Sequence, residues 1–154
     1  MSSFSGKPTT FVERAIENDG FWPDPSVAEF QKGYRLPAEY LVDMLVTDLS
    51  TAMIEVNRDL AKRKGQWLNV GITSVESADP RVLPERTFHA ATYKRAVYCR
   101  AKASLLTQFA TVTRRESAEN TGKELPERGE TFLEFSQQAV RSLQGRGRIT
   151  AALL

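Results

Sequence analysis

The stretch "LPAEYLVDMLVTDLSTAMIEVNRDLAKRKGQ", Leu36–Gln66, carries the strongest structural signal in the chain. Its apolar residues recur at steps of three and four, the spacing that lines one face of an α-helix. This stripe consists of Leu41, Leu45, Leu49, Ala52, Val56 and Leu60. Acidic residues near the start and basic residues near the end suit the helix dipole. The pattern predicts a long amphipathic helix from about Pro37 to Lys64, stopped by Gly65.

A second long helix is predicted from Pro84 or Thr87 to about Arg115. One of its stripes holds large side chains: Tyr93, Val97, Ala101, Leu105, Phe109 and Val112. A neighbouring stripe holds mostly small ones: Thr92, Ala96, Cys99, Ala103, Leu106 and Ala110. Small side chains let another helix approach closely, so we expect a helix to pack on the second stripe.

Shorter elements flank these two helices. Asp24 and Pro25 resemble an N-cap followed by proline in the first turn, which predicts a short helix over 25–32 that ends at Gly33. A last helix is expected over 130–143, with Phe132, Phe135 (or Leu133), Ala139 and Leu143 on its apolar face. Two loops are predicted: one over 67–83, which has room for one short strand, and one over 114–131.

These elements predict an all-α fold: an elongated helical bundle with two long antiparallel helices, shorter N- and C-terminal helices and long loops. We divide the chain into an N-terminal arm over 1–20, with at most a short helix over 10–17, a helical domain over 21–144 and an extended C-terminal arm over 145–154. Phe21 and Trp22, where the domain begins, anchor the N-terminal arm either to the bundle or to an adjacent subunit, and core packing is favoured for Trp22.

Composition narrows the function classes. The 154 residues fit one domain, and a net charge of +2 is small for a dedicated nucleic-acid binder. A single cysteine rules out an internal disulfide, and one histidine with one cysteine cannot form a usual zinc site. The N-terminal residues do not resemble a signal peptide, and no apolar run is long enough for a membrane span. We therefore expect a cytoplasmic protein without metal, cofactor or membrane contact.

Catalytic chemistry finds no support in the sequence. The Gly-Lys pairs in "GKPTT" and "TGKELP" lack the earlier glycine and the preceding strand of a phosphate-binding loop. His89 has no orienting partner at a fixed spacing, so a surface or packing role is favoured. Cys99 lies among alanines on an apolar stripe, which favours a buried and unreactive thiol.

Two charged groups admit more than one interpretation. "EVNRDL", Glu55–Leu60, is either a solvated helix face or a salt-bridge patch between subunits. Basic residues of the second long helix and its end are either solvated or directed toward a polyanion. That group consists of Arg95, Arg100, Lys102, Arg114 and Arg115.

The C-terminal stretch "GRGRITAALL", Gly145–Leu154, is unusual for a chain end because its last residues are almost entirely apolar. The bundle can end at Leu143 without them. Periodicity therefore leaves this stretch available for contact with another chain.

Four stretches in order resemble the head completion proteins, gene-product-L type, of temperate contractile-tailed bacteriophages. They are "GFWPDPSVAEFQKGYRL", "MIEVNRDL", "YKRAVYCRAKASLL" and "VRSLQGRGRITAALL", and the resemblance covers about residues 20–154. The chain departs from the family pattern in a shorter loop between the long helices, in the stretch after Arg115, and at Phe135 or Ser136, where the family commonly has tryptophan.

The resemblance implies a non-enzymatic virion protein of the head–tail neck, assembled in the bacterial host cytoplasm. Such adaptors dock as a ring of twelve subunits beneath the portal protein after DNA packaging and link it to a tail-proximal neck or stopper protein. The C-terminal arm would then bind the portal through Arg146, Arg148, Ile149, Thr150, Leu153 and Leu154.

Ring neighbours would meet along the flanks of the long helices, at Glu55, Arg58, Asp59 and Arg95. Arg114 and Arg115 would face DNA in the channel. Rival interpretations are another phage neck protein, although those are usually rich in β-structure, and a helical nucleic-acid-binding or regulatory module.

Overall fold

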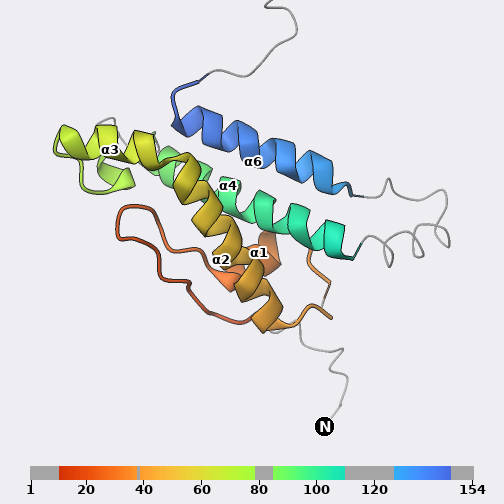
Figure 1. The fold of residues 1–154 in the computed structure, drawn as a ribbon. Coiled ribbons are helices and arrows are strands. Elements are labelled where there is room, and N and C mark those ends of the chain that lie inside the picture. Colours follow the sequence, from red (N-terminus) through yellow and green to blue (C-terminus); the bar gives the residue numbers. More distant parts are fainter. Residues whose placement is uncertain (1–10, 38, 79–84, 110–126, 147–154) are drawn as a thin grey trace, which may run out of the picture.

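The computed structural model describes residues 11–37, 39–78, 85–109 and 127–146, and they form an all-helical arrangement (Figure 1). The helices are α1 (Val27–Gly33), α2 (Val42–Asp59), α3 (Ala61–Asn69), α4 (Glu85–Gln108) and α6 (Gly129–Leu143), with a short 3-10 turn, η1, at Val75–Ala78. No strand occurs in these ranges, where the β-pairing is an isolated bridge between Ala15 and Ser26. The all-α prediction is confirmed.

Helix α2 carries the apolar stripe that the sequence predicted. Leu45, Leu49, Ala52 and Val56 are buried in the core, as is Leu60 just after the helix. Leu41 is 71% exposed, because the helix begins at Val42 and not near Pro37. Leu41 has extended backbone angles, and the residues before it form a turn in which the Tyr40 N–H donates to the Pro37 carbonyl.

The predicted long helix is divided at Leu60, whose ψ of 3° separates α2 from α3. Gly65 does not stop the helix, so this prediction was wrong. Gly65 lies inside α3, which extends to Asn69 and contains the buried Trp67. The terminator is Gly71, with φ of +87°, a left-handed conformation that glycine adopts at little cost. The N–H groups of Gly71 and Ile72 donate to the carbonyls of Leu68 and Trp67, which closes the helix end.

Helix α4 packs on α2 with one face and on α6 with another, as Figure 1 shows. The face with large side chains is buried from Tyr93 to Leu105, as predicted. The face with small side chains receives α6 at close range, also as predicted: a Cβ added to Gly129 would lie 3.2 Å from the Ala103 carbonyl oxygen. Residues 110–115 of the predicted helix lie outside the described ranges.

The segment before α1 is an extended arm that packs on the bundle. Phe21 and Trp22 are 3% and 2% exposed, and the Trp22 ring stacks on Tyr93 with centroids 4.9 Å apart. Residues 11–17 are not helical, so no short helix forms there. Helix α1 begins at Val27, and its N-cap is Ser26, whose hydroxyl accepts from the Glu29 N–H; Asp24 instead accepts from the Asn18 N–H.

Candidate interaction surfaces

The predicted cluster on α2 is joined to α4 within one chain. The Arg100 guanidinium lies 3.0 Å from Asp59 and 3.8 Å from Glu55, and only 13% of its side chain is exposed. Arg100 also donates to the Ser136 hydroxyl, which in turn donates to the Ala96 carbonyl. Glu55 and Asp59 remain 49% and 45% exposed. Their carboxylates therefore neutralise Arg100 and still border solvent.

The structure does not bring all four predicted interface residues together. Arg58 is exposed on α2 near Glu55 and Asp59. Arg95 instead places its guanidinium 5.2 Å from the centre of the Phe135 ring on α6, where it lines a hollow that Tyr34 also lines. The four residues thus form two separate patches.

Two tyrosines in the stretch "YKRAVYCRAKASLL" of α4 form hydrogen bonds to α1, to α2 and to the segment before α1. Tyr93 donates to the Asn57 side chain and accepts from Asn18, and Asn57 donates to Asn18, so three elements meet in one polar triangle. Tyr98 donates to Glu29 and accepts from the Ser26 N–H. "EVNRDL" and "YKRAVYCRAKASLL" therefore contain residues that fix the fold.

Two acidic residues of the N-terminal part have lowered pKa values. Burial alone would raise the pKa of Asp19, but bonds from Lys64 and from the backbone N–H groups of Trp22 and Phe21 lower it. Burial likewise opposes the lowered pKa of Glu29, which is produced by hydrogen bonds from Tyr98 and Lys94. Both carboxylates are therefore held in the charged form, Asp19 within the segment before α1 and Glu29 beside α4.

Lys102 is buried, so for this residue both interpretations, a solvated side chain and one directed toward a polyanion, were wrong. Its side chain is 2% exposed, and its ammonium donates to the Tyr34 carbonyl at 2.7 Å and forms an ion pair with Glu127 at 2.8 Å. The Arg35 carbonyl lies 3.4 Å away. One ammonium thus joins the end of α1, the middle of α4 and the approach to α6. In the sequence the only sign of this burial is that Lys102 directly follows Ala101, a residue of the predicted apolar stripe.

Helix α6 ends at Leu143, as predicted, in a closed glycine motif. Gly145 has φ of +76°, and the N–H groups of Gly145 and Arg146 donate to the carbonyls of Ser142 and Arg141. Two side chains fasten this end to the α2–α3 junction: Arg63 donates to the Leu143 carbonyl, and Gln144 donates to the Asp59 carbonyl. Sequence reasoning missed both contacts because their partners lie 80 and 85 residues away.

Only the first residues of the predicted C-terminal arm fall within the described part. Arg146 is exposed directly after the glycine motif. The other predicted portal-binding residues and both predicted DNA-channel residues lie outside it: Arg148, Ile149, Thr150, Leu153, Leu154, Arg114 and Arg115.

The described residues show neither a metal-binding cluster of His, Cys, Asp and Glu nor a helix long and apolar enough to cross a membrane. Cys99 is buried, as predicted, and burial raises the pKa of its thiol. His89 is half-buried, with its ring tilted against Trp67. Both residues are therefore packing side chains in this fold.

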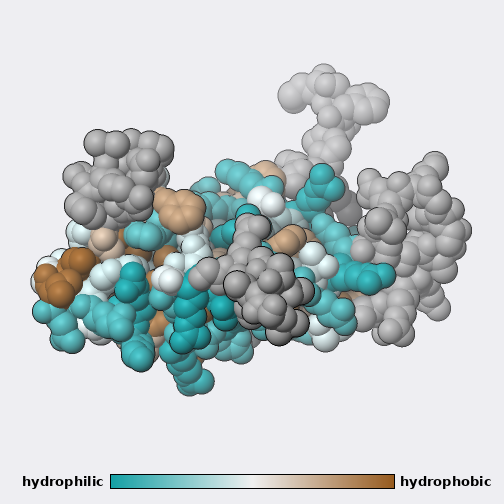
Figure 2. Space-filling model, turned by 90° about the horizontal axis from the view of Figure 1, so that it is seen from above, coloured by the Kyte–Doolittle hydropathy of each residue, from teal (hydrophilic) through white to brown (hydrophobic). Residues whose placement is uncertain are grey.

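The face seen in Figure 2 is mostly hydrophilic, with small separate apolar spots, one of them at the end where α3 lies. That end carries the exposed side chains of Leu68 and Val70. Together these features define a small all-helical protein in which residues of "EVNRDL" and "YKRAVYCRAKASLL" bond one helix to another.

The chain belongs to the family of phage head completion proteins (GPL), whose model matches residues 16–154. It is 31% identical over 151 residues to a protein of Haemophilus phage HP1 (strain HP1c1) described as a probable head completion/stabilization protein. That match covers 98% of this chain and 99% of the relative. No solved structure was found to match. Family membership implies a component of the virion.

Proposed function

We propose that the chain is a head–tail adaptor without enzymatic activity, which docks beneath the portal protein as a ring of twelve copies after DNA packaging. The ring links the portal to the tail-proximal neck protein and is assembled in the host cytoplasm. In this proposal the elongated bundle, with its two long helices antiparallel, forms the ring wall, and Arg114 and Arg115 line the DNA passage.

The observation that carries this proposal is the closed end of α6. The helix is complete at Leu143, and Gly145, Arg63 and Gln144 satisfy the carbonyl groups of that end and of the α2–α3 junction. Leu143 is the last residue of the hydrophobic core among the described residues. The apolar sequence that follows is available to bind the portal, with Ile149, Leu153 and Leu154 as apolar anchors and Arg146, Arg148 and Thr150 as polar contacts.

The two patches fit the requirements of a ring. Neighbours in a ring meet head to tail, so the two sides of each contact differ. One side of the contact consists of Arg58, Glu55 and Asp59 on α2. The second side is Arg95 on α4. A weak arm repeated around such a ring gives a durable joint through its effective concentration.

Truncation tests the docking arm. A chain that ends at Arg146 should keep the helical circular dichroism and melting temperature of the full chain, because the α6 end motif is retained. It should fail to join portal-containing heads in sedimentation and electron microscopy. A chain with residues 147–154 replaced by a Gly/Ser segment of equal length controls for length. Attachment of either variant at the level of the full chain would overturn the docking proposal.

A further inference from the structure

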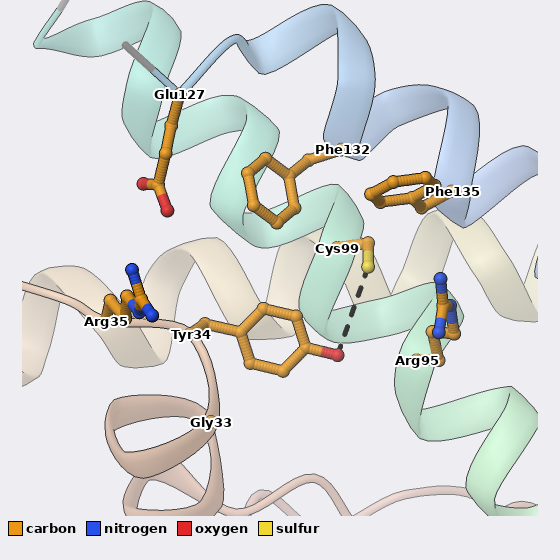
Figure 3. A pocket seen from close by; sticks show the side chains of 8 residues that line it. All are labelled: Gly33, Tyr34, Arg35, Arg95, Cys99, Glu127, Phe132 and Phe135. Atoms are coloured by element: carbon orange, nitrogen blue, oxygen red, sulfur yellow. Dashed lines mark hydrogen bonds between the residues drawn. The ribbon is translucent and has the colours of Figure 1, made fainter. Parts of the chain in front are cut away.

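A hollow of about 320 Å³ lies between the end of α1, the middle of α4 and the first half of α6 (Figure 3). The Tyr34 ring lies on one side, and Phe132 and Phe135 lie across from it on α6. The guanidinium groups of Arg35 and Arg95 rise on opposite sides of the Tyr34 ring. The hollow has room for one or two side chains and is at the small end of ligand sites.

One end of the hollow gathers hydrogen-bond donors. The Tyr34 hydroxyl accepts a weak bond from the Cys99 thiol at 3.9 Å, which leaves the phenolic hydrogen to donate elsewhere. Burial raises the pKa of Tyr34 and the Cys99 thiol adds to the rise, whereas the nearby charge of Arg95 acts in the opposite direction. The phenol is therefore a neutral donor beside a permanent cation.

Positive charge in the hollow exceeds negative charge. Arg35 and Arg95 are both exposed, and neither belongs to an ion pair formed among the described residues. The carboxylate there is Glu127, and the buried Lys102 already neutralises it. An anion entering the hollow would thus meet two guanidinium groups that no carboxylate among the described residues neutralises.

The backbone beside the hollow is held in an uncommon conformation. Arg35 has φ of +49°, the left-handed region that residues other than glycine rarely adopt. The ammonium of Lys102 holds this segment through the Tyr34 carbonyl, with the Arg35 carbonyl 3.4 Å away. Strain held by surrounding bonds is common at binding sites.

We propose that this hollow binds a peptide segment of a partner protein in which an aspartate or glutamate stands beside an aromatic or aliphatic side chain. The carboxylate is held by Arg95 and the Tyr34 hydroxyl, and the apolar side chain lies against Phe132 and Phe135. This proposal uses none of the residues of the docking arm and stands whether or not the arm binds the portal. It shares Arg95 with the proposed ring contact, so a partner peptide and a ring neighbour would compete for that residue.

A peptide fits the hollow better than a nucleic acid. Charge-assisted bonds from a guanidinium and a phenol to one carboxylate are strong and directional, and the facing aromatic rings suit an apolar side chain. A nucleic-acid strand would bring successive phosphates, to which the rings of Phe132 and Phe135 offer no hydrogen-bond donor.

Titration of the full chain tests the proposal, with backbone amide NMR signals of residues 33–35, 95–99 and 132–135 as the readout. The probe is acetyl-Asp-Phe-amide, and acetyl-Asn-Phe-amide is its uncharged match. We expect saturable shifts with the Asp probe at about millimolar concentration and roughly tenfold weaker binding of the Asn probe, the effect of losing a charge-assisted bond.

Variants separate this site from general electrostatic attraction. Arg95→Gln and Tyr34→Phe should weaken the Asp probe by roughly tenfold and roughly threefold or more, respectively, whereas Arg95→Lys should keep part of the binding. Lys62→Gln, with the same charge change at an exposed position on α3, should bind within about twofold of the native chain. Melting curves confirm that each variant is folded.

Two results would overturn the proposal. One is equal binding of the Asp and Asn probes, or unchanged binding by folded Arg95→Gln. The other is tighter binding of the dinucleotide pTpT than of the peptide at the same signals, which would make the hollow a nucleic-acid site.

Discussion

At the scale of single residues, one buried and one partly buried cation connect the parts of this protein. Lys102 and Arg100 lie two positions apart on α4, and each joins α4 to two other parts of the chain. An ammonium removed from water costs free energy unless its hydrogen bonds are replaced. For Lys102, the Tyr34 carbonyl and the Glu127 carboxylate take the place of water. The same bonds hold the segments that contain Tyr34 and Glu127 against α4.

Lys102→Met should destabilise the protein by about 2–4 kcal/mol, because it leaves the Tyr34 carbonyl and Glu127 without their donor while keeping most of the side-chain volume. Urea unfolding measures the loss. Lys62→Met on α3, where the lysine is exposed, is the control and should change the free energy of unfolding by less than about 0.5 kcal/mol. A Lys102→Met value as small as that of the control would contradict the role of the buried ammonium.

At the scale of elements, two glycines that look alike in the sequence have opposite roles. Gly65 lies within α3 and open space surrounds its Cα, so an added methyl group meets nothing within 4 Å. Gly71 ends the helix with φ of +87°, where an L-residue is strained whatever the space. The difference lies in the backbone conformation, which the residue type alone does not reveal.

Gly65→Ala should stabilise the protein by about 0.5–1 kcal/mol, because alanine loses less conformational entropy in a helix. Gly71→Ala should destabilise it by about 1 kcal/mol, because it forces a left-handed conformation on a residue with a Cβ. Denaturant midpoints of both variants give the comparison. The same sign for the two changes would show that α3 ends differently from the structure described above.

Periodicity predicted α6 and most of α4 because their apolar spacing and their limits are local signals. It missed the division at Leu60, since Val56 and Leu60 continue the apolar pattern across the junction. The charged contacts were not predictable either. Asp59 meets Arg100, and Glu29 meets Lys94 and Tyr98, only after distant parts of the chain pack together. The hollow beside Arg95 arises in the same way, from three elements.

At the scale of the whole molecule, the separation of the interface residues determines which of them can test a ring. Glu55 and Asp59 neutralise Arg100 inside the chain, so changing them would also disturb the fold. Arg58 is exposed and lies on the same helix, and it is therefore the cleaner probe of contact between subunits.

The proposed ring predicts that Arg58→Glu keeps the native melting temperature but lowers the number of copies bound to portal-containing heads. The reason is that a glutamate cannot make the hydrogen bonds that the Arg58 guanidinium donates in the proposed contact, and this loss is repeated around the ring. Quantitative mass spectrometry of purified heads counts the copies. Lys32→Glu, the same charge reversal at an exposed position on α1, should leave the count unchanged. Native occupancy by Arg58→Glu would argue against an α2 contact.

The arm that packs on α4 also sets an order of events during synthesis. Asn18 and Ser26 bond to tyrosines that are 75 and 72 residues further along the chain. Trp22, which stacks on Tyr93, is therefore synthesised long before its partner. Loops of this length close slowly compared with helix formation. The first part of the chain to be made is thus among the last to reach its place.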